Sequence, residues 1–217
     1  MAQGGGAQPR LGGGRGIIRA LNKLIIFLED IFMMVFEKPG VHNTDEASMI
    51  AIKKAAELGC AIIAPTTDGD AGRRLCELAK EQGFTGPIVI VTHSYGSKVK
   101  GENALKPENR AAMVADGAII VTAAHALSGV ERGMSTRFSG VYPAEIMANT
   151  LRMFSQGIKV AVEIGSMALD AGAAEYGKPH VCMGGTGHGL DTAVIMSPAH
   201  ASSIFETNIH EVLCLPY

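Results

Sequence analysis

Four polar, glycine-rich segments contain the residue types that could hold or act on a small molecule. They are residues 65–72, 92–96, 125–133 and 184–189, and each follows an apolar, strand-like run. Small hydroxyl groups and glycines let a phosphate approach backbone N–H groups, and histidine rings and arginines can contact an anion or the edge of a ring. The four segments together predict a ligand site, provided that the fold brings them to one place.

The first segment opens a helical stretch, where unpaired N–H groups and the helix dipole favour an anion such as phosphate. Asp68 and Asp70 give an alternative, because a carboxylate at this position can cap the helix itself. The sequence leaves phosphate binding and simple capping open. The residues that would let a phosphate reach the backbone are Thr66, Thr67, Gly69 and Gly72.

The last segment has G-x-G-x-G spacing after a strand-like run. It does not match the dinucleotide-binding fingerprint, because a further strand follows it in place of a helix. The favoured interpretation is a flexible connection that needs positive φ angles. The alternative is a loop whose backbone closes over a ligand. Its residues are Gly184, Gly185, Thr186, Gly187 and His188.

Catalytic groups do not assemble into a known pattern. His93, His125, His188 and His200 all follow predicted strands and could converge, yet a lone histidine in such a place is more often a hydrogen-bond partner than a base. The sequence contains no nucleophile elbow, phosphate-binding P-loop or HExxH motif. Arg132 lies among small residues, where it is either a solvated surface charge or an anion contact. The catalytic residues therefore stay unassigned.

The elements that must position these groups alternate between strands and helices. This alternation predicts right-handed βαβ units in a three-layer αβα sandwich, an α/β fold with a mostly parallel sheet. The last strand-like runs are too close in sequence for helical crossovers, so we expect an antiparallel edge. The predicted strands cover 33–37, 60–65, 87–93, 118–123, the start of 159–172, 180–185, 191–198 and 209–216, and the helices begin near residues 43, 70, 107 and 143.

Composition limits the classes of function. The 217 residues are 47% hydrophobic and 18% charged, which is enough to bury a large core, and the formal net charge is −2. This charge gives no basic surface for nucleic acid or an anionic membrane. The four cysteines lie far apart without metal-ligand spacing, so we expect reduced thiols, no metal site and a cytoplasmic protein.

The domain pattern begins at Met33, so we expect one domain over residues 33–217. Residues 1–16 are glycine-rich and of low complexity, and residues 17–32 are apolar but interrupted by charges. This leader is a peripheral amphipathic element, a segment that packs on a partner subunit, or a misassigned start with translation beginning at Met33 or Met34. Its longest uncharged run is too short to span a membrane.

The residues also carry a family resemblance. The stretch from Asn43 to Thr92 resembles the alternating core of the pyruvate kinase C-terminal domain. The whole of 33–217 is similar to small stand-alone prokaryotic proteins of the pyruvate kinase alpha/beta-domain-like group. The segments that carry this similarity are FEKPGVHNT, GENALKPE, HALSGVERG, GIKVAVEI, GGTGHGLDTAVIMSPAHASSIF and HEVLCLP.

The resemblance implies a fold and a ligand class. The catalytic barrel of pyruvate kinase is lacking, so kinase activity is not implied. Some members of the stand-alone group hold FMN, which makes FMN or another phosphorylated metabolite the expected ligand. Its phosphate would lie at residues 66–72 or 184–189, and its ring beside the cofactor-binding candidates Thr92, His93, Ser94, Tyr95, Ser128, Gly129 and Arg132.

Two alternative functions stay open beside this small-molecule binding domain. One is a flavin-dependent oxidoreductase, which would reduce bound flavin with a nicotinamide cofactor. The other is a regulatory or oligomerisation module, as the equivalent domain of pyruvate kinase is, and this leaves a homo-oligomer open. The expected partner is a small phosphorylated ligand, with neither nucleic acid nor membrane.

Overall fold

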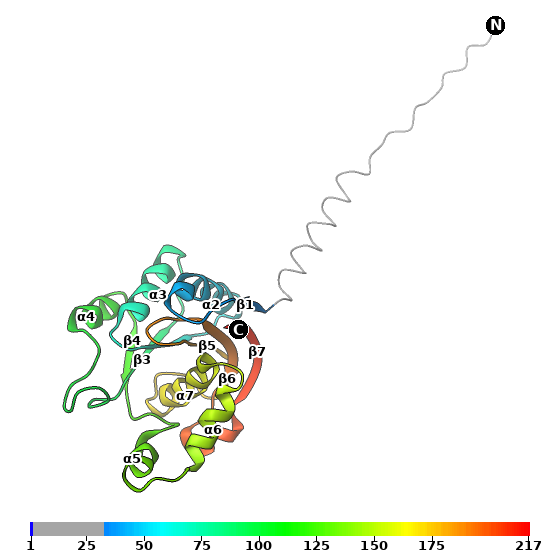
Figure 1. The fold of residues 1–217 in the computed structure, drawn as a ribbon. Coiled ribbons are helices and arrows are strands. Elements are labelled where there is room, and N and C mark those ends of the chain that lie inside the picture. The colour runs from blue at the N-terminus through cyan, green and yellow to red at the C-terminus, as the bar shows by residue number, and fades with distance from the viewer. Residues whose placement is uncertain (2–32) are drawn as a thin grey trace. The chain divides into compact units, whose positions relative to one another are not determined.

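The computed structural model describes Met1 and residues 33–217, and Met33–Tyr217 form one compact unit. The expectations for residues 2–32 lie outside the described residues. A seven-stranded sheet crosses this unit in the order β1-β7-β6-β5-β2-β3-β4 (Figure 1). The strands are β1 (Met34–Phe36), β2 (Ile62–Thr66), β3 (Ile88–Thr92), β4 (Ile119–Thr122), β5 (His180–Gly184), β6 (Thr192–Ser197) and β7 (Asn208–Pro216).

Most pairings in the sheet are parallel. β2 pairs in parallel with β3 and β5, β3 with β4, and β1 with β7. β6 runs antiparallel to both of its neighbours, β5 and β7. The connection from β5 to β6 is too short for a helical crossover, so the chain must return antiparallel. The α/β prediction is confirmed, and the antiparallel strand lies two places in from the β1 edge.

Helices cover both faces of the sheet (Figure 1). Ile62, Ala64 and Ile90 point into a core shared with α2 and α3, whereas Ile63 and Val89 point into a core shared with α7. Strands buried on both faces are typical of helix-covered parallel sheets. The helices are α2 (Thr44–Leu58), α3 (Asp70–Glu81), α4 (Pro107–Ala115), α5 (Gly129–Phe138), α6 (Pro143–Arg152) and α7 (Gln156–Asp170), with 3-10 turns η1 (Val41–Asn43) and η2 (Ala201–Glu206).

The predicted strand at the start of residues 159–172 is wrong, because this segment belongs to helix α7. α7 lies on the sheet beside β5, β2 and β6, and nearly all of its residues are buried. The β-branched residues Val160, Val162 and Ile164 alternate with other residues at the start of α7, which is the period-2 pattern of a strand. Gly165 lies where a Cβ would overlap the side chain of Met196, which allows the helix to pack closely on the sheet.

Strand order reverses between β2 and β5. From β2 the chain continues through α3 to β3, whereas α7 on the opposite face leads into β5. Ligands of open α/β sheets bind beyond the carboxyl ends of the strands at such a switch point.

Among the described residues, none of the helices has both the length and the apolar character that a membrane span needs.

Candidate functional site

A cavity of about 830 Å³ opens at the switch point, beyond the carboxyl ends of β2 and β3. Residues that follow β4 and β5, together with residues of α5, the end of α6 and α7, complete its walls. The structure thus brings parts of all four predicted segments to one place. The predicted residues that line the cavity are Thr66, Thr67, Thr92, His93, Ser94, Tyr95, Ser128, Gly129, Arg132, Gly185, Gly187 and His188.

Gly69 and Gly72 do not line the cavity, because Gly69 lies against Leu105 and Asn109, and Gly72 lies against Met113 and Ile90. Asp68 Oδ1 accepts a hydrogen bond from the Asp70 N–H at 3.2 Å, and Thr66 Oγ1 accepts one from the Gly72 N–H at 3.3 Å. Gly69 has a φ of +103°, which a residue with a Cβ rarely adopts. Of the two alternatives for this helix start, the geometry favours capping.

Gly184 and Thr186 also lie outside the cavity walls and stabilise the loop behind them. The side chain of Asp191 is fully buried, and its Oδ2 accepts hydrogen bonds from the N–H groups of Thr186 at 3.2 Å and Gly40 at 3.0 Å. His188 extends from the same loop, and its Nδ1 lies 3.5 Å from Asp68 Oδ2. The loop therefore spans the switch point, and the buried Asp191 carboxylate fixes its backbone.

Lys159 and Glu163 of α7 form a buried ion pair in the cavity wall, and sequence reasoning missed both. Lys159 is 6% exposed and Glu163 is 3% exposed. The Lys159 ammonium donates to Glu163 Oε2, and the Leu127 N–H donates to Glu163 Oε1 at 3.0 Å. Their spacing of four residues is the signal of a helical ion pair, which the strand assignment concealed.

Two histidines continue this polar cluster into the cavity. His93 Nδ1 and His125 Nε2 are 3.0 Å apart, and His125 Nδ1 lies 3.5 Å from Glu163 Oε2. His188 lines the same cavity, so three of the four histidines considered from the sequence lie at its walls. The fourth, His200, lies elsewhere and hydrogen-bonds to Asp170 at 2.8 Å.

Burial and charge shift the protonation of these groups. Burial alone would favour the neutral acid of Glu163, but the His125 hydrogen bond and the Lys159 charge overcome it and lower its pKa to about 2. Burial lowers the pKa of Lys159, an effect that Glu163 opposes. Burial and then the nearby His125 lower the pKa of His93. Glu163 is therefore an anion and His93 a neutral ring near neutral pH.

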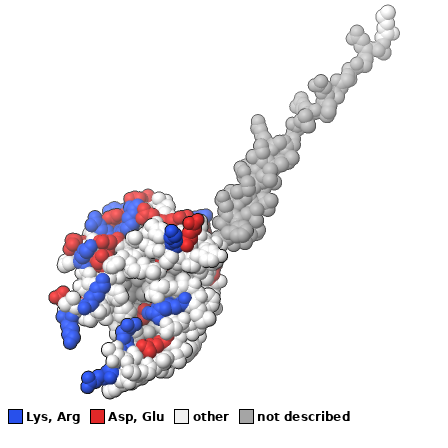
Figure 2. Space-filling view, in the orientation of Figure 1, with Lys and Arg blue, Asp and Glu red and all other residues white. Residues whose placement is uncertain are grey.

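Two arginines at the cavity have no acidic partner among the described residues. Arg152 donates to the neutral side chains of Gln156 at 2.7 Å and Asn149 at 3.0 Å, and Arg132 makes no ion pair. On the α2–α3 side the charges are instead mixed (Figure 2), as in the pair between Arg74 and Asp45 at 2.7 Å. The cavity thus carries uncompensated positive charge, which favours an anionic ligand.

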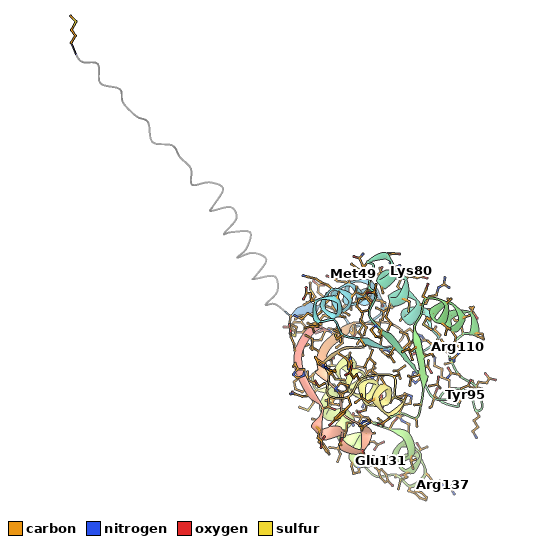
Figure 3. All side chains as sticks on the ribbon, turned by 180° about the vertical axis from the view of Figure 1, so that it is seen from behind. Met49, Lys80, Tyr95, Arg110, Glu131 and Arg137 are labelled. Carbon is orange, nitrogen blue, oxygen red and sulfur yellow. The ribbon has the colours of Figure 1, made fainter. Side chains whose placement is uncertain are left out.

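The rim of the cavity is exposed. Tyr95 is 68% exposed and lies on the loop that leaves β3, whereas Glu131 and Arg137 lie on α5 (Figure 3). Glu131 Oε2 accepts a hydrogen bond from the Ala144 N–H at 2.7 Å and so binds α5 to the start of α6. Arg137 is not part of the cavity wall.

Comparison with known protein families gives a match over most of the chain. The pyruvate kinase, alpha/beta domain family matches residues 45–196. The matched range runs from the first turn of α2 into β6 and includes all the residues that line the cavity.

Proposed function

Because the chain belongs to the pyruvate kinase alpha/beta domain family, we propose that its cavity binds a phosphorylated small molecule, with FMN as the leading candidate. The observation that carries this proposal is the positive charge at the cavity. Arg132 and Arg152 line it without an acidic partner among the described residues. An anion that entered the cavity would supply the missing partner for both guanidinium groups.

The size and position of the cavity support a ligand of this class. Small-molecule sites usually have volumes of about 300–1,000 Å³ and occur at the switch points of α/β sheets. Apolar side chains of Val91, Ile164 and Met167 line part of the wall. They suit a flat ring, while the arginines suit a phosphate.

We assign the phosphate to the α5–α7 side of the cavity. Arg132 of α5, Arg152 before α7 and Gln156 in the first turn of α7 all line this side. The first turn of a helix adds a favourable dipole for an anion. The start of α3 is the weaker candidate, because none of residues 68–72 lines the cavity, whereas Gln156 of α7 does.

Purification without added cofactor followed by FMN titration tests the proposal. The absorbance of bound flavin, or quenching of flavin fluorescence with a dissociation constant in the micromolar range, would support it. Absence of binding below about 1 mM, which corresponds to about −4 kcal/mol, would exclude FMN as the ligand. Mass spectrometry of material released from the denatured protein would then identify another phosphorylated compound, if one is bound.

A further inference from the structure

A chain of three side chains leads from the cavity to a buried carboxylate. His93 lines the cavity, and its Nδ1 lies 3.0 Å from His125 Nε2. His125 Nδ1 in turn faces Glu163 Oε2 at 3.5 Å. The backbone of His93 is fixed as well, because its carbonyl accepts a hydrogen bond from the Asn103 amide at 2.9 Å. The arrangement is thus preorganised at its cavity end.

Hydrogen-bond polarity determines which nitrogen carries each proton. His125 Nδ1 lies 3.5 Å from Glu163 Oε2, and the ionised carboxylate favours a proton on that nitrogen. The other nitrogen of a neutral His125, Nε2, is then an acceptor, so the His93 Nδ1 must donate to it. His93 is therefore left with an unprotonated Nε2. No side chain or backbone group of the described residues hydrogen-bonds to that atom.

We propose that His93 Nε2 is the proton-accepting group of the cavity and that it binds a ligand N–H or O–H group. The ligand class rests on the proposed function: an anion whose charge is held by the arginines and whose ring or chain presents a hydrogen-bond donor. A phosphate oxygen is an acceptor and cannot fill this role. His125 and Glu163 are positioning residues, because they act through His93.

The chain also gives a transferred proton a path. When a ligand proton moves to His93 Nε2, the Nδ1 proton of His93 moves to His125 Nε2. The positive charge then resides on His125 beside ionised Glu163, and the electron pair stays on the ligand as an anion near Arg132 and Arg152. The geometry provides a proton acceptor, a relay and a counter-ion, an arrangement that suits a general base.

Burial, together with the positive charges around it, keeps the resting ring neutral. Besides His125 and Glu163, the charged groups that face His93 are Lys98 on the loop after β3 and Lys159 on α7. Both lysines oppose protonation of His93, and Lys159 also balances the charge of Glu163. The ring is thus available as an acceptor near pH 7.

Nitrogen-15 NMR of the histidine rings in the ligand-free full chain tests the tautomer directly. The expected result is a protonated Nδ1 and an unprotonated Nε2 on His93 near neutral pH. Glu163→Gln should remove this preference and give a mixture of tautomers. Asp170→Asn is the matched control, because it removes a carboxylate from His200 and should leave His93 unchanged. A protonated Nε2 on His93 in the wild type would overturn the proposal.

If Glu163→Gln does not fold, two further variants test whether His125 and Glu163 set the tautomer of His93. His125→Phe removes the relay while keeping the Lys159–Glu163 pair, and His93 should then lose its fixed tautomer. The double variant Lys159→Met, Glu163→Gln removes both buried charges and should give the same result. An unchanged His93 tautomer in either variant would show that the chain does not set it.

A comparison of two ligands tests this inference separately from the proposed function. FMN should bind to the wild type at least about ten-fold more tightly than N3-methyl FMN, because methylation removes the ring N–H and leaves the acceptor unpaired. His93→Phe should abolish the difference. Equal affinities for the two flavins in the wild type would contradict the ligand role of His93. Failure of both flavins to bind would contradict FMN as the ligand and leave the tautomer measurement to decide on His93.

Discussion

Gly184, the last residue of β5, packs directly on the carbonyl group of Gly157 in the first turn of α7. A Cβ on Gly184 would overlap the backbone of Gly157, and a Cβ on Gly157 would overlap the side chain of Thr192. Neither neighbour is the flexible end of a long side chain. This contact fixes the start of α7, and with it Gln156 and Lys159, against the strand ends that surround the cavity.

Gly184→Ala should destabilise the domain, because the added methyl group meets backbone that cannot move away. Overpacking of this kind costs about 1–3 kcal/mol or more, and a shifted denaturant midpoint in urea unfolding would report it. The matched control is Gly133→Ala in α5, where nothing lies within 4 Å of the new Cβ. That change should stabilise by about 0.5–1 kcal/mol, as alanine does over glycine in a helix. Equal midpoints for the two variants would show that the contact is not tight.

The Lys159–Glu163 pair should behave as one unit in a double-mutant cycle. Glu163→Gln or Lys159→Met alone leaves a buried charge without its partner, which costs about 3–5 kcal/mol. The double variant should recover much of the loss, because no unpaired charge is left. Urea unfolding of the four proteins measures the coupling. Strictly additive losses would mean that the two side chains do not depend on one another.

Acid stability should depend on Glu163. Its folded pKa of about 2 lies below the unfolded value, so its contribution is present above the unfolded pKa and is lost as the pH falls through the folded pKa. A shift from about 4.3 to about 2 corresponds to a stabilisation of about 3 kcal/mol. The free energy of unfolding should therefore fall between about pH 5 and pH 2. Glu163→Gln should flatten that part of the curve, and parallel curves would rule out the assignment.

Arg132→Gln should weaken FMN binding by at least about ten-fold, or about 1.4 kcal/mol, because the variant loses a charge-assisted contact. Arg137→Gln is the matched control, because Arg137 lies on the same helix, α5 (Figure 3), and is not among the residues that line the cavity. The same loss of affinity in both variants would indicate a general effect of charge. Isothermal titration at one fixed salt concentration compares the two.

The sequence predicted the strand ends better than the helix that faces them. Thr66, Thr92 and Gly185 come directly at or after strands, so their meeting at one edge follows from parallel pairing. α7 was mistaken for a strand because Val160, Val162 and Ile164 place a β-branched residue at every second position, as a strand does. Lys159 and Glu163 were missed with it, since their pairing is visible only at helical spacing.

Contacts between residues that are far apart in the sequence could not be predicted from local sequence patterns. Asp191 accepts a hydrogen bond from the N–H of Gly40, which is 151 residues away in the chain. Nothing in the sequence around either residue indicates that pairing. The histidine chain likewise depends on the approach of β3, β4 and α7, because His93, His125 and Glu163 come from three separate parts of the chain. Local reasoning could name the histidines but not join them.

A calorimetric comparison of FMN with riboflavin tests the central proposal most directly, because the two ligands differ only in the phosphate. If Arg132 and Arg152 hold that phosphate, FMN should bind with a micromolar dissociation constant, and riboflavin at least about ten-fold more weakly. Arg132→Gln should reduce the difference between them. Equal affinities for the two compounds, or no binding of FMN below about 1 mM, would contradict the assignment of the cavity to a phosphorylated flavin.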